Sequence, residues 1–236
     1  MAIFYYSDRL MQVDKNKEIV VYKKHSLTIR WTHWINFPLL TIMIISGFMI
    51  YWANDVYTPF IDFTFYNKVG LSQKLALGMG IHFVFMWLFA LNGVAYTLYL
   101  VFSGQWREHI PKLSSFRDAL LVTLHDLKLR RHLPAQDKFN GAQKIAYFSI
   151  AALGFVQLLT GLAIYKPVQL LQLLSLFGGY ENTRFIHFIV TVLFILFFLV
   201  HLLQVVRAGW NNFRSMITGT EEITESEIQR AQGIKK

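Results

Sequence analysis

Four long apolar segments dominate the hydropathy pattern of this chain. None contains Asp, Glu, Lys or Arg, and they cover residues 31–54, 75–106, 145–165 and 185–206. An α-helix of about 20 apolar residues crosses the hydrocarbon core of a bilayer and satisfies its own backbone hydrogen bonds. The pattern therefore predicts an all-α membrane protein, built as a bundle of four transmembrane helices.

These segments define one expected domain with a tail at each end. With their flanks, the spans are expected at about residues 30–54, 73–104, 141–166 and 183–208. The four-helix domain then covers residues 27–218, between an N-terminal tail (1–26) and a C-terminal tail (219–236). No internal repeat or low-complexity tract is evident.

Basic residues are concentrated in alternate connections of the predicted bundle. Six Lys and Arg precede the first span, eight lie in residues 107–144, and five follow the fourth span. The other two connections share only Lys68, Lys74, Lys166 and Arg184. Since cytoplasmic loops carry the excess of basic residues, we expect both termini and the central loop in the cytoplasm. The net charge of +9 then reflects membrane anchoring, and no nucleic-acid partner is expected.

The composition excludes several classes of protein. Of the residues, 54% are hydrophobic and 16% are charged, against about a quarter charged in an ordinary soluble domain. The chain has no Cys. It therefore has no thiolate nucleophile, iron–sulfur cluster, CxxC zinc site or covalent c-type haem attachment.

Four extramembrane segments have patterns of their own. Residues 19–22 follow a polar stretch and predict a short β-hairpin. The apolar outer loop, residues 166–182, predicts a short interfacial helix or a docking surface for another subunit. The tail after Gly219 is rich in Glu and predicts a charged solvent helix or a disordered end. In the central loop, a helical period predicts an amphipathic helix on the membrane surface through Phe116, Leu120, Leu121, Leu124 and Leu127.

Four histidines inside the spans are the main candidates for chemistry, since an ionisable residue in a membrane helix suggests a function. They are His33, His82, His187 and His201. The other four, in predicted cytoplasmic segments, are interpreted as solvated or interfacial residues: His25, His109, His125 and His132.

The intramembrane histidines fall at two depths. His33 and His201 lie near the cytoplasmic ends of the first and fourth spans, whereas His82 and His187 lie in the outer half. The 14 residues between His187 and His201 make about four helical turns, so both rings project from one face, about 21 Å apart.

Two stacked histidine pairs in a Cys-free bundle favour haem b held by axial imidazoles from facing helices. Because two imidazoles fill both axial positions, the expected chemistry is electron transfer. One alternative is that the histidines are hydrogen-bonded packing residues. Another is a proton relay or metal transporter, although the spans offer no Asp or Glu as further ligands.

Other residues fit two haems at these depths. Arg30 and Arg184 each precede an intramembrane histidine by three residues, at a membrane boundary where haem propionates would emerge. Gly47 and Gly93 fall near the levels of the outer and inner haem, where a missing side chain lets a porphyrin approach. The alternatives are ordinary arginine anchoring and helix–helix packing at small residues.

The stretch Arg30-Trp31-Thr32-His33-Trp34, followed by an apolar helix ending in Ser46-Gly47, resembles the first span of the prokaryotic di-haem cytochrome b superfamily. The single histidine of the second span and the pair in the fourth match it too. Members include the cytochrome b subunits of nickel–iron hydrogenases, the gamma subunits of formate dehydrogenases and thiosulfate reductase cytochrome b subunits. The resemblance covers roughly residues 25–218.

This resemblance implies that His33 and His201 bind the inner haem, and that His82 and His187 bind the outer one. It also implies a site for menaquinone or ubiquinone near the inner haem. Formate dehydrogenase gamma subunits have Asn-Ala-Gly-Gln there, whereas this chain has Asn140-Gly141-Ala142-Gln143. Asn140, Gly141 and Gln143 are therefore candidate quinone-binding residues, and Asn140 is equally suited to cap the third span.

Together these features imply a multi-pass subunit of the bacterial inner membrane that transfers electrons between a partner and the quinone pool. We expect an electron-transfer subunit rather than an enzyme by itself. The partner is expected on the outer face, as a hydrogenase, a molybdenum enzyme or a c-type cytochrome. The alternatives are a stand-alone quinol:acceptor cytochrome, a proton or metal transporter, and a structural anchor that has lost its haem.

Overall fold

The computed structural model describes residues 10–14, 19–53, 67–68, 70, 74–126, 128–129 and 141–224. The chain divides into two compact units. Thr28–Tyr99 form the first, here called the hairpin unit. Met1–Leu27 and Leu100–Lys236 form the second, here called the terminal unit because it holds both chain ends.

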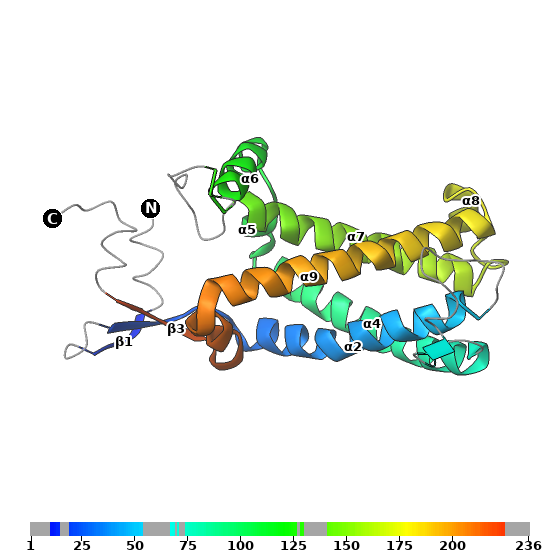
Figure 1. Cartoon of the computed structure of the whole chain (residues 1–236), viewed down its shortest axis with the longest axis horizontal. Helices are drawn as coiled ribbons and strands as arrows, with labels where there is room; N and C mark the ends of the chain where they lie inside the picture. Colours follow the sequence, from blue (N-terminus) through cyan, green and yellow to red (C-terminus); the bar gives the residue numbers. More distant parts are fainter. Residues whose placement is uncertain are drawn as a thin grey trace. The chain divides into compact units, whose positions relative to one another are not determined.

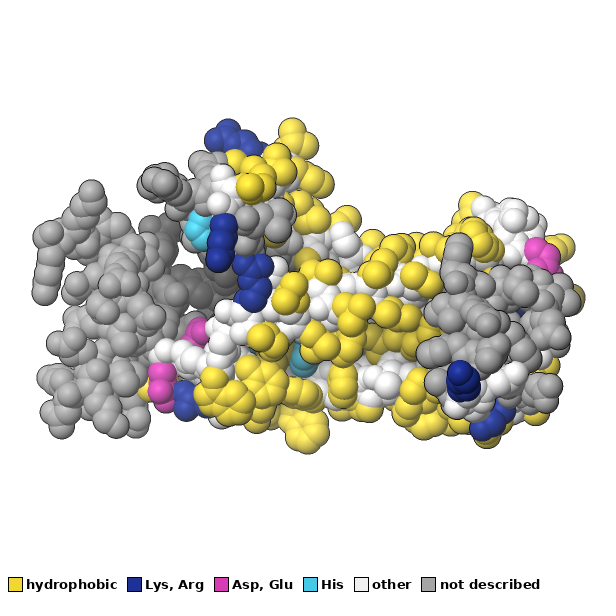
Figure 2. Space-filling view, viewed as in Figure 1, with side chains coloured by type: hydrophobic (Ala, Val, Ile, Leu, Met, Phe, Trp, Pro, Cys, Tyr) yellow, Lys and Arg dark blue, Asp and Glu magenta, His cyan; other side chains and the backbone are white. Residues whose placement is uncertain are grey.

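Four helices are long and apolar enough to cross a membrane, which confirms the four predicted spans (Figure 1). They are α2 (Leu27–Tyr51), α4 (Leu75–Phe102), α7 (Gly141–Tyr165) and α9 (Tyr180–Thr218). Large hydrophobic side chains are exposed along these helices (Figure 2), among them Val84, Leu91 and Phe155. Such side chains suit contact with lipid, because a bilayer solvates apolar surface that water does not.

In the hairpin unit, α2 and α4 pack closely as an antiparallel pair. A Cβ atom built on the buried Gly78 of α4 would lie 2.8 Å from Met49 Cβ and 3.2 Å from Ser46 O on α2. Further along, Asn92 of α4 donates a hydrogen bond to Thr32 O of α2, at 3.0 Å. The small residue permits the close approach of the two backbones, as is common between membrane helices.

In the terminal unit, α7 packs against α9 and is crossed near its start by α6 (Leu113–Asp126). A Cβ atom at Gly141, the first residue of α7, would lie 2.5 Å from Ser115 O and 2.8 Å from Ala119 N of α6. Only a glycine fits this crossing without displacing the α6 backbone.

Two of the loop predictions correspond to observed helices. The predicted helix of the central loop is α6, and Phe116 and Leu120 are exposed on it, whereas Leu127 lies outside the described residues. The short helix predicted in the outer loop is α8 (Leu171–Leu176). A further short helix, α5 (Trp106–His109), follows α4.

The predicted hairpin is confirmed as β1 (Leu10–Asp14) paired antiparallel with β2 (Ile19–Lys23). The expectation for the C-terminal tail was wrong for its first residues, because β3 (Thr220–Thr224) pairs with β2 and completes a three-stranded sheet. Strand β2 offers β3 a row of backbone partners, and Lys24 Nζ forms an ion pair with Glu221 Oε2 at 3.0 Å. The rest of the tail lies outside the described residues.

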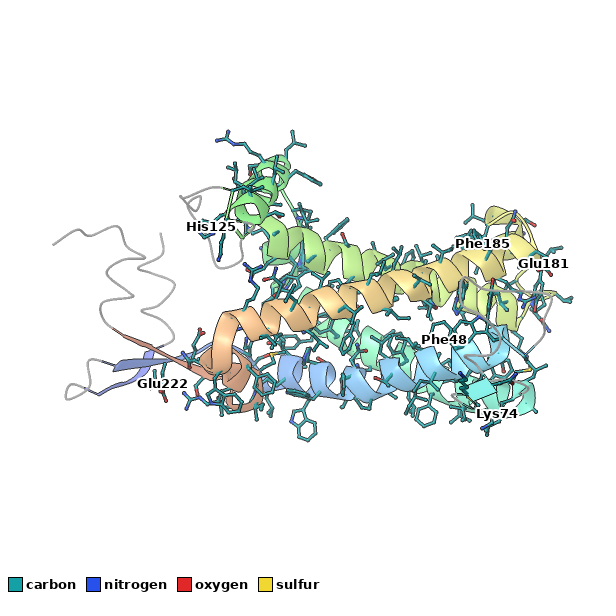
Figure 3. All side chains as sticks on the ribbon, in the orientation of Figure 1. Phe48, Lys74, His125, Glu181, Phe185 and Glu222 are labelled. Carbon is teal, nitrogen blue, oxygen red and sulfur yellow. The ribbon has the colours of Figure 1, made fainter. Side chains whose placement is uncertain are left out.

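Helix α9 contains a break at Gly209, whose φ of 82° lies outside helical geometry. This break falls directly after the expected end of the fourth span, and a second helical segment then leads to β3. Glu222, labelled in Figure 3, ties that segment to the sheet: its carboxylate lies 2.7 Å from Arg214 Nη2, and its backbone N–H and C=O bind the Asn211 side chain. Strand β3 is thus fastened both to β2 and to the last part of α9.

Candidate functional site

The four intramembrane histidines are divided between the two units. His33 on α2 and His82 on α4 belong to the hairpin unit, and His187 and His201 on α9 belong to the terminal unit. All four are partly buried. Each expected ligand pair takes one histidine from each unit, so the pairings stay predictions.

In the hairpin unit, a buried hydroxyl fixes the imidazole of His82. Its Nδ1 lies 2.9 Å from Ser46 Oγ on α2, and Ser46 Oγ also lies 3.2 Å from the Met43 carbonyl oxygen. A hydroxyl has one hydrogen. If it goes to the carbonyl, which only accepts, Ser46 Oγ must accept the Nδ1–H of His82. The lone pair of the ring then resides on Nε2, the form of histidine that binds a metal.

In the terminal unit, the same arrangement surrounds His187. Its Nδ1 lies 2.9 Å from Thr160 Oγ1 on α7, and Thr160 Oγ1 donates to the Val156 carbonyl oxygen at 2.8 Å. The proton of this imidazole therefore also resides on Nδ1, and the lone pair on Nε2.

A glycine follows each of these hydroxyl residues. A Cβ atom at Gly47 would lie 3.6 Å from His82 Cε1, and one at Gly161 would lie 3.2 Å from His187 Cε1. Gly47 thus lies at the level of His82, whereas a Cβ atom at Gly93 would meet nothing within 4 Å.

The Nε2 atom of His187 has a neighbour of its own. The amide nitrogen of Gln157 lies 3.1 Å from it and donates a second hydrogen bond to Thr191 Oγ1, at 3.0 Å. Within the described residues, the amide oxygen Gln157 Oε1 is buried without a hydrogen-bond partner. A metal on His187 Nε2 requires this amide to turn away.

The surroundings of the other two histidines are more aromatic. The ring of His33 meets Trp34 edge-on at 5.5 Å, and the ring of His201 lies parallel to Phe197 at 6.2 Å. Near His33, Asn92 also lies within 3.4 Å of Asn36 Oδ1, so amide groups link the two helices at this level.

The remaining predicted residues are placed as follows. Arg184 lies 3.6 Å from Glu181 and 5.8 Å from the Tyr180 ring, at the start of α9, where Figure 3 labels Glu181. Arg30 is partly buried in the first turn of α2. In the candidate quinone site, Gly141 packs against α6, Gln143 is exposed and Asn140 lies outside the described residues.

Several residues of the site were missed from the sequence. They are Thr160, Gly161, Gln157 and Asn92, together with the role of Ser46 as a hydrogen-bond acceptor. One signal was available: Ser46-Gly47 and Thr160-Gly161 each place a hydroxyl before a glycine inside an apolar helix. A pair of residues is too short a pattern to be recognised as a repeated motif before the histidines beside it are known.

Comparison with known proteins gives the family. Residues 24–219 match the family described as prokaryotic cytochrome b561. The chain belongs to this family. It is therefore a multi-pass membrane cytochrome b of electron transport, and the family implies haem b. The resemblance seen in the sequence is confirmed.

A curated relative gives a further comparison. It is a protein of Azospira oryzae, provisionally named protein-methionine-sulfoxide reductase subunit YedZ1. The two chains are 33% identical over 168 residues, which cover 71% of this chain and 82% of the relative.

The residues present fit haem b. Two partly buried imidazoles carry their lone pairs on Nε2, and glycines beside both rings leave space where a side chain would otherwise stand. Uncharged imidazoles that coordinate through one nitrogen while the other donates a hydrogen bond are the usual protein ligands of iron.

Proposed function

We propose that this chain is a di-haem membrane subunit that transfers electrons between a partner oxidoreductase and the membrane quinone pool. Haem b, when bound, supplies one-electron redox chemistry. The observation that carries the proposal is the arrangement of His82 and His187 in a cytochrome b561 chain. Each ring has its Nδ1 hydrogen-bonded to a buried hydroxyl and its Nε2 in the ligand form.

Two haems are proposed because the histidines lie at two depths. His187 and His201 are separated by four turns of α9, which places their rings about 21 Å apart along the helix. We assign His82 and His187 to the outer haem and His33 and His201 to the inner one. Arg184 and Arg30, each three residues before a ligand, are the proposed partners of the propionates.

The proposed topology has both termini in the cytoplasm of a bacterium, with the chain in the inner membrane. The pairing of β2 with β3 supports a common side for the two ends, because β2 closely precedes α2 and β3 directly follows α9. The basic residues of the termini and of the central loop support the cytoplasmic side.

The proposed partner is a catalytic subunit that docks on the outer face. In the loop between α7 and α9, Val168, Leu171 and Leu176 are exposed by 82%, 61% and 74%. This apolar surface, here called the α8 patch, directly precedes α9 in the sequence, and Arg184 and His187 lie in the first turns of α9. The relative from Azospira oryzae is itself named as a reductase subunit, which supports a catalytic partner.

For the quinone, we propose a site at the start of α7. Gln143 is exposed on the first turn of that helix, and Asn140 precedes it. Gly141 is proposed to act indirectly, because its contact with α6 sets how closely that helix crosses this end of α7. Menaquinone and ubiquinone both present the carbonyl oxygens that these amide groups would bind.

The first test is the haem content of the purified protein and of four single variants, measured by the pyridine haemochrome assay. We expect two haems b per chain. His82→Ala and His187→Ala should each remove the outer haem, and His33→Ala and His201→Ala the inner one, because one axial imidazole alone holds haem weakly. His25→Ala, outside the spans, is the matched control and should retain both.

Each other outcome contradicts a different part of the proposal. A full haem complement in all four variants would show that the ligand assignment is wrong. One haem in the unsubstituted protein would mean that one histidine pair is structural. A colourless protein would favour a transporter or a structural anchor.

A further inference from the structure

The hairpin unit and the terminal unit contain the same local arrangement: a buried hydroxyl, the glycine after it, and an imidazole from the neighbouring helix. We propose that Ser46 and Thr160 are positioning residues for the two ligands of the outer haem. Each hydroxyl fixes the tautomer and the plane of its imidazole and holds the redox potential of that haem low. The inference rests on the proposed ligation by His82 and His187.

The direction of the two hydrogen bonds follows from the backbone contacts of the hydroxyls. Ser46 Oγ lies 3.2 Å from the Met43 carbonyl oxygen, and Thr160 Oγ1 lies 2.8 Å from that of Val156 and 3.2 Å from that of Gln157. These carbonyls only accept, so a hydroxyl that bonds to one of them uses its single hydrogen there. Both hydroxyls are left to accept from Nδ1.

Burial makes each hydrogen bond hard to replace. Ser46 is 1% exposed and Thr160 is 0% exposed, so water has no access to either hydroxyl. In surroundings of low dielectric constant, a hydrogen bond is stronger than in water, and a polar atom without its partner is costly. The Nδ1–H of each ring is therefore held in one direction.

The two glycines leave room for the same two rings on a second side. The Cε1 atom, which a side chain at Gly47 or Gly161 would approach, lies between the two ring nitrogens. At Gly161 the 3.2 Å separation is already tighter than an ordinary van der Waals contact. A side chain there would press on the imidazole and displace it by a few tenths of an ångström.

The chemical consequence concerns the iron-binding nitrogen. An Nδ1–H that donates a hydrogen bond increases the basicity of Nε2. A more basic ligand stabilises the oxidised iron, so the midpoint potential falls. With an acceptor in place on both ligands, the two effects act on one haem.

The test uses Ser46→Ala and Thr160→Val in the full-length, haem-loaded protein. Midpoint potentials are measured by optical redox titration, and the ligand planes by the low-spin ferric EPR signals. The outer haem is identified as the one lost in His82→Ala. We expect a positive shift of the outer potential and a moved or broadened outer EPR signal, with both inner signals unchanged.

Matched controls separate the hydroxyl from general helix packing. Thr41→Ala and Thr123→Val each remove a hydroxyl that, like that of Thr160, bonds to the carbonyl four residues earlier, but at an exposed position. They should leave both potentials unchanged. Thr160→Ser keeps the hydroxyl and should retain the original outer potential and EPR signal.

The remaining outcomes decide the question. If Thr160→Val loses the outer haem while Thr160→Ser keeps it, the hydroxyl is required for ligation, which supports the inference. If Ser46→Ala and Thr160→Val both leave the outer potential and EPR signal unchanged, the inference is overturned while the haem ligation stands. If His82→Ala and His187→Ala retain two haems, the proposed function has failed instead.

Discussion

At the scale of single residues, the chemistry of a histidine depends on the hydrogen bond that its second ring nitrogen makes. An imidazole in an apolar helix is ambiguous, because it serves equally well in packing, proton transfer and metal ligation. Ser46 and Thr160 reduce this ambiguity, since each hydroxyl lies 2.9 Å from an Nδ1 atom, and a hydroxyl that accepts the Nδ1–H leaves the lone pair on Nε2. The side chains that orient the candidate ligands are thus neutral hydroxyls on the neighbouring helix.

Gln157 gives a prediction at this scale. Its amide nitrogen binds His187 Nε2, the atom proposed to bind iron, and its amide oxygen is buried without a partner in the described residues. Gln157→Leu removes both features. One hydrogen bond contributes about 0.5–1.5 kcal/mol net, and in this variant the amide no longer competes with iron for Nε2. We therefore expect the outer haem to be retained and to dissociate up to about tenfold more slowly.

This rate is measured by transfer of haem to an excess of apomyoglobin. Gln172→Leu, on an exposed position of α8, is the control for a glutamine substitution and should dissociate as the original protein does. Loss of the outer haem in Gln157→Leu would mean that the amide supports the site rather than competing for it.

At the scale of helices, glycine decides where backbones can meet. Gly141 is a candidate quinone-binding residue, and a Cβ atom there would overlap the α6 backbone. We expect Gly141→Ala to lower the free energy of unfolding by about 1–3 kcal/mol, the usual cost of overpacking. Thermal unfolding in detergent measures this, because the crossing of α6 over α7 would open.

Gly154→Ala is the matched control on the same helix, since a Cβ atom at Gly154 meets nothing within 4 Å. It should unfold at the original temperature. If Gly141→Ala were fully stable yet slow with quinol, the glycine would act at the quinone rather than through α6.

At the scale of the whole molecule, the proposal depends on a partner that the chain alone does not provide. The α8 patch (Val168, Leu171 and Leu176) is its proposed docking surface. We expect Leu171→Asp with Leu176→Asp to retain both haems but to lose the partner, because a buried charge without a counter-charge strongly disfavours association.

The measurement is the amount of a second subunit that co-purifies from the native membrane, together with haem content. Leu113→Asp, on an exposed position of α6, is the control and should keep the partner bound. Undiminished co-purification in the doubly substituted protein would place the partner elsewhere. A chain that purifies alone even without substitution would favour the stand-alone quinol:acceptor cytochrome.

The sequence by itself determined the four spans, because an uncharged run long enough to cross a bilayer has few alternatives to a helix. It also gave the hairpin at residues 19–22, the helices of the two loops and the family, which rests on the motif around His33 and the spacing of His187 and His201. These features are local or periodic, so the order of residues is enough to see them.

Only the tertiary structure decided which residues from different helices meet. Ser46 lies 36 positions from His82, and Thr160 lies 27 positions from His187, so no local pattern links hydroxyl to imidazole. The same holds for β3, whose charged residues resemble a solvent-exposed tail until β2 supplies backbone partners about 200 residues away. Contacts of this kind depend on how the helices and strands pack, which hydropathy and spacing along one chain do not contain.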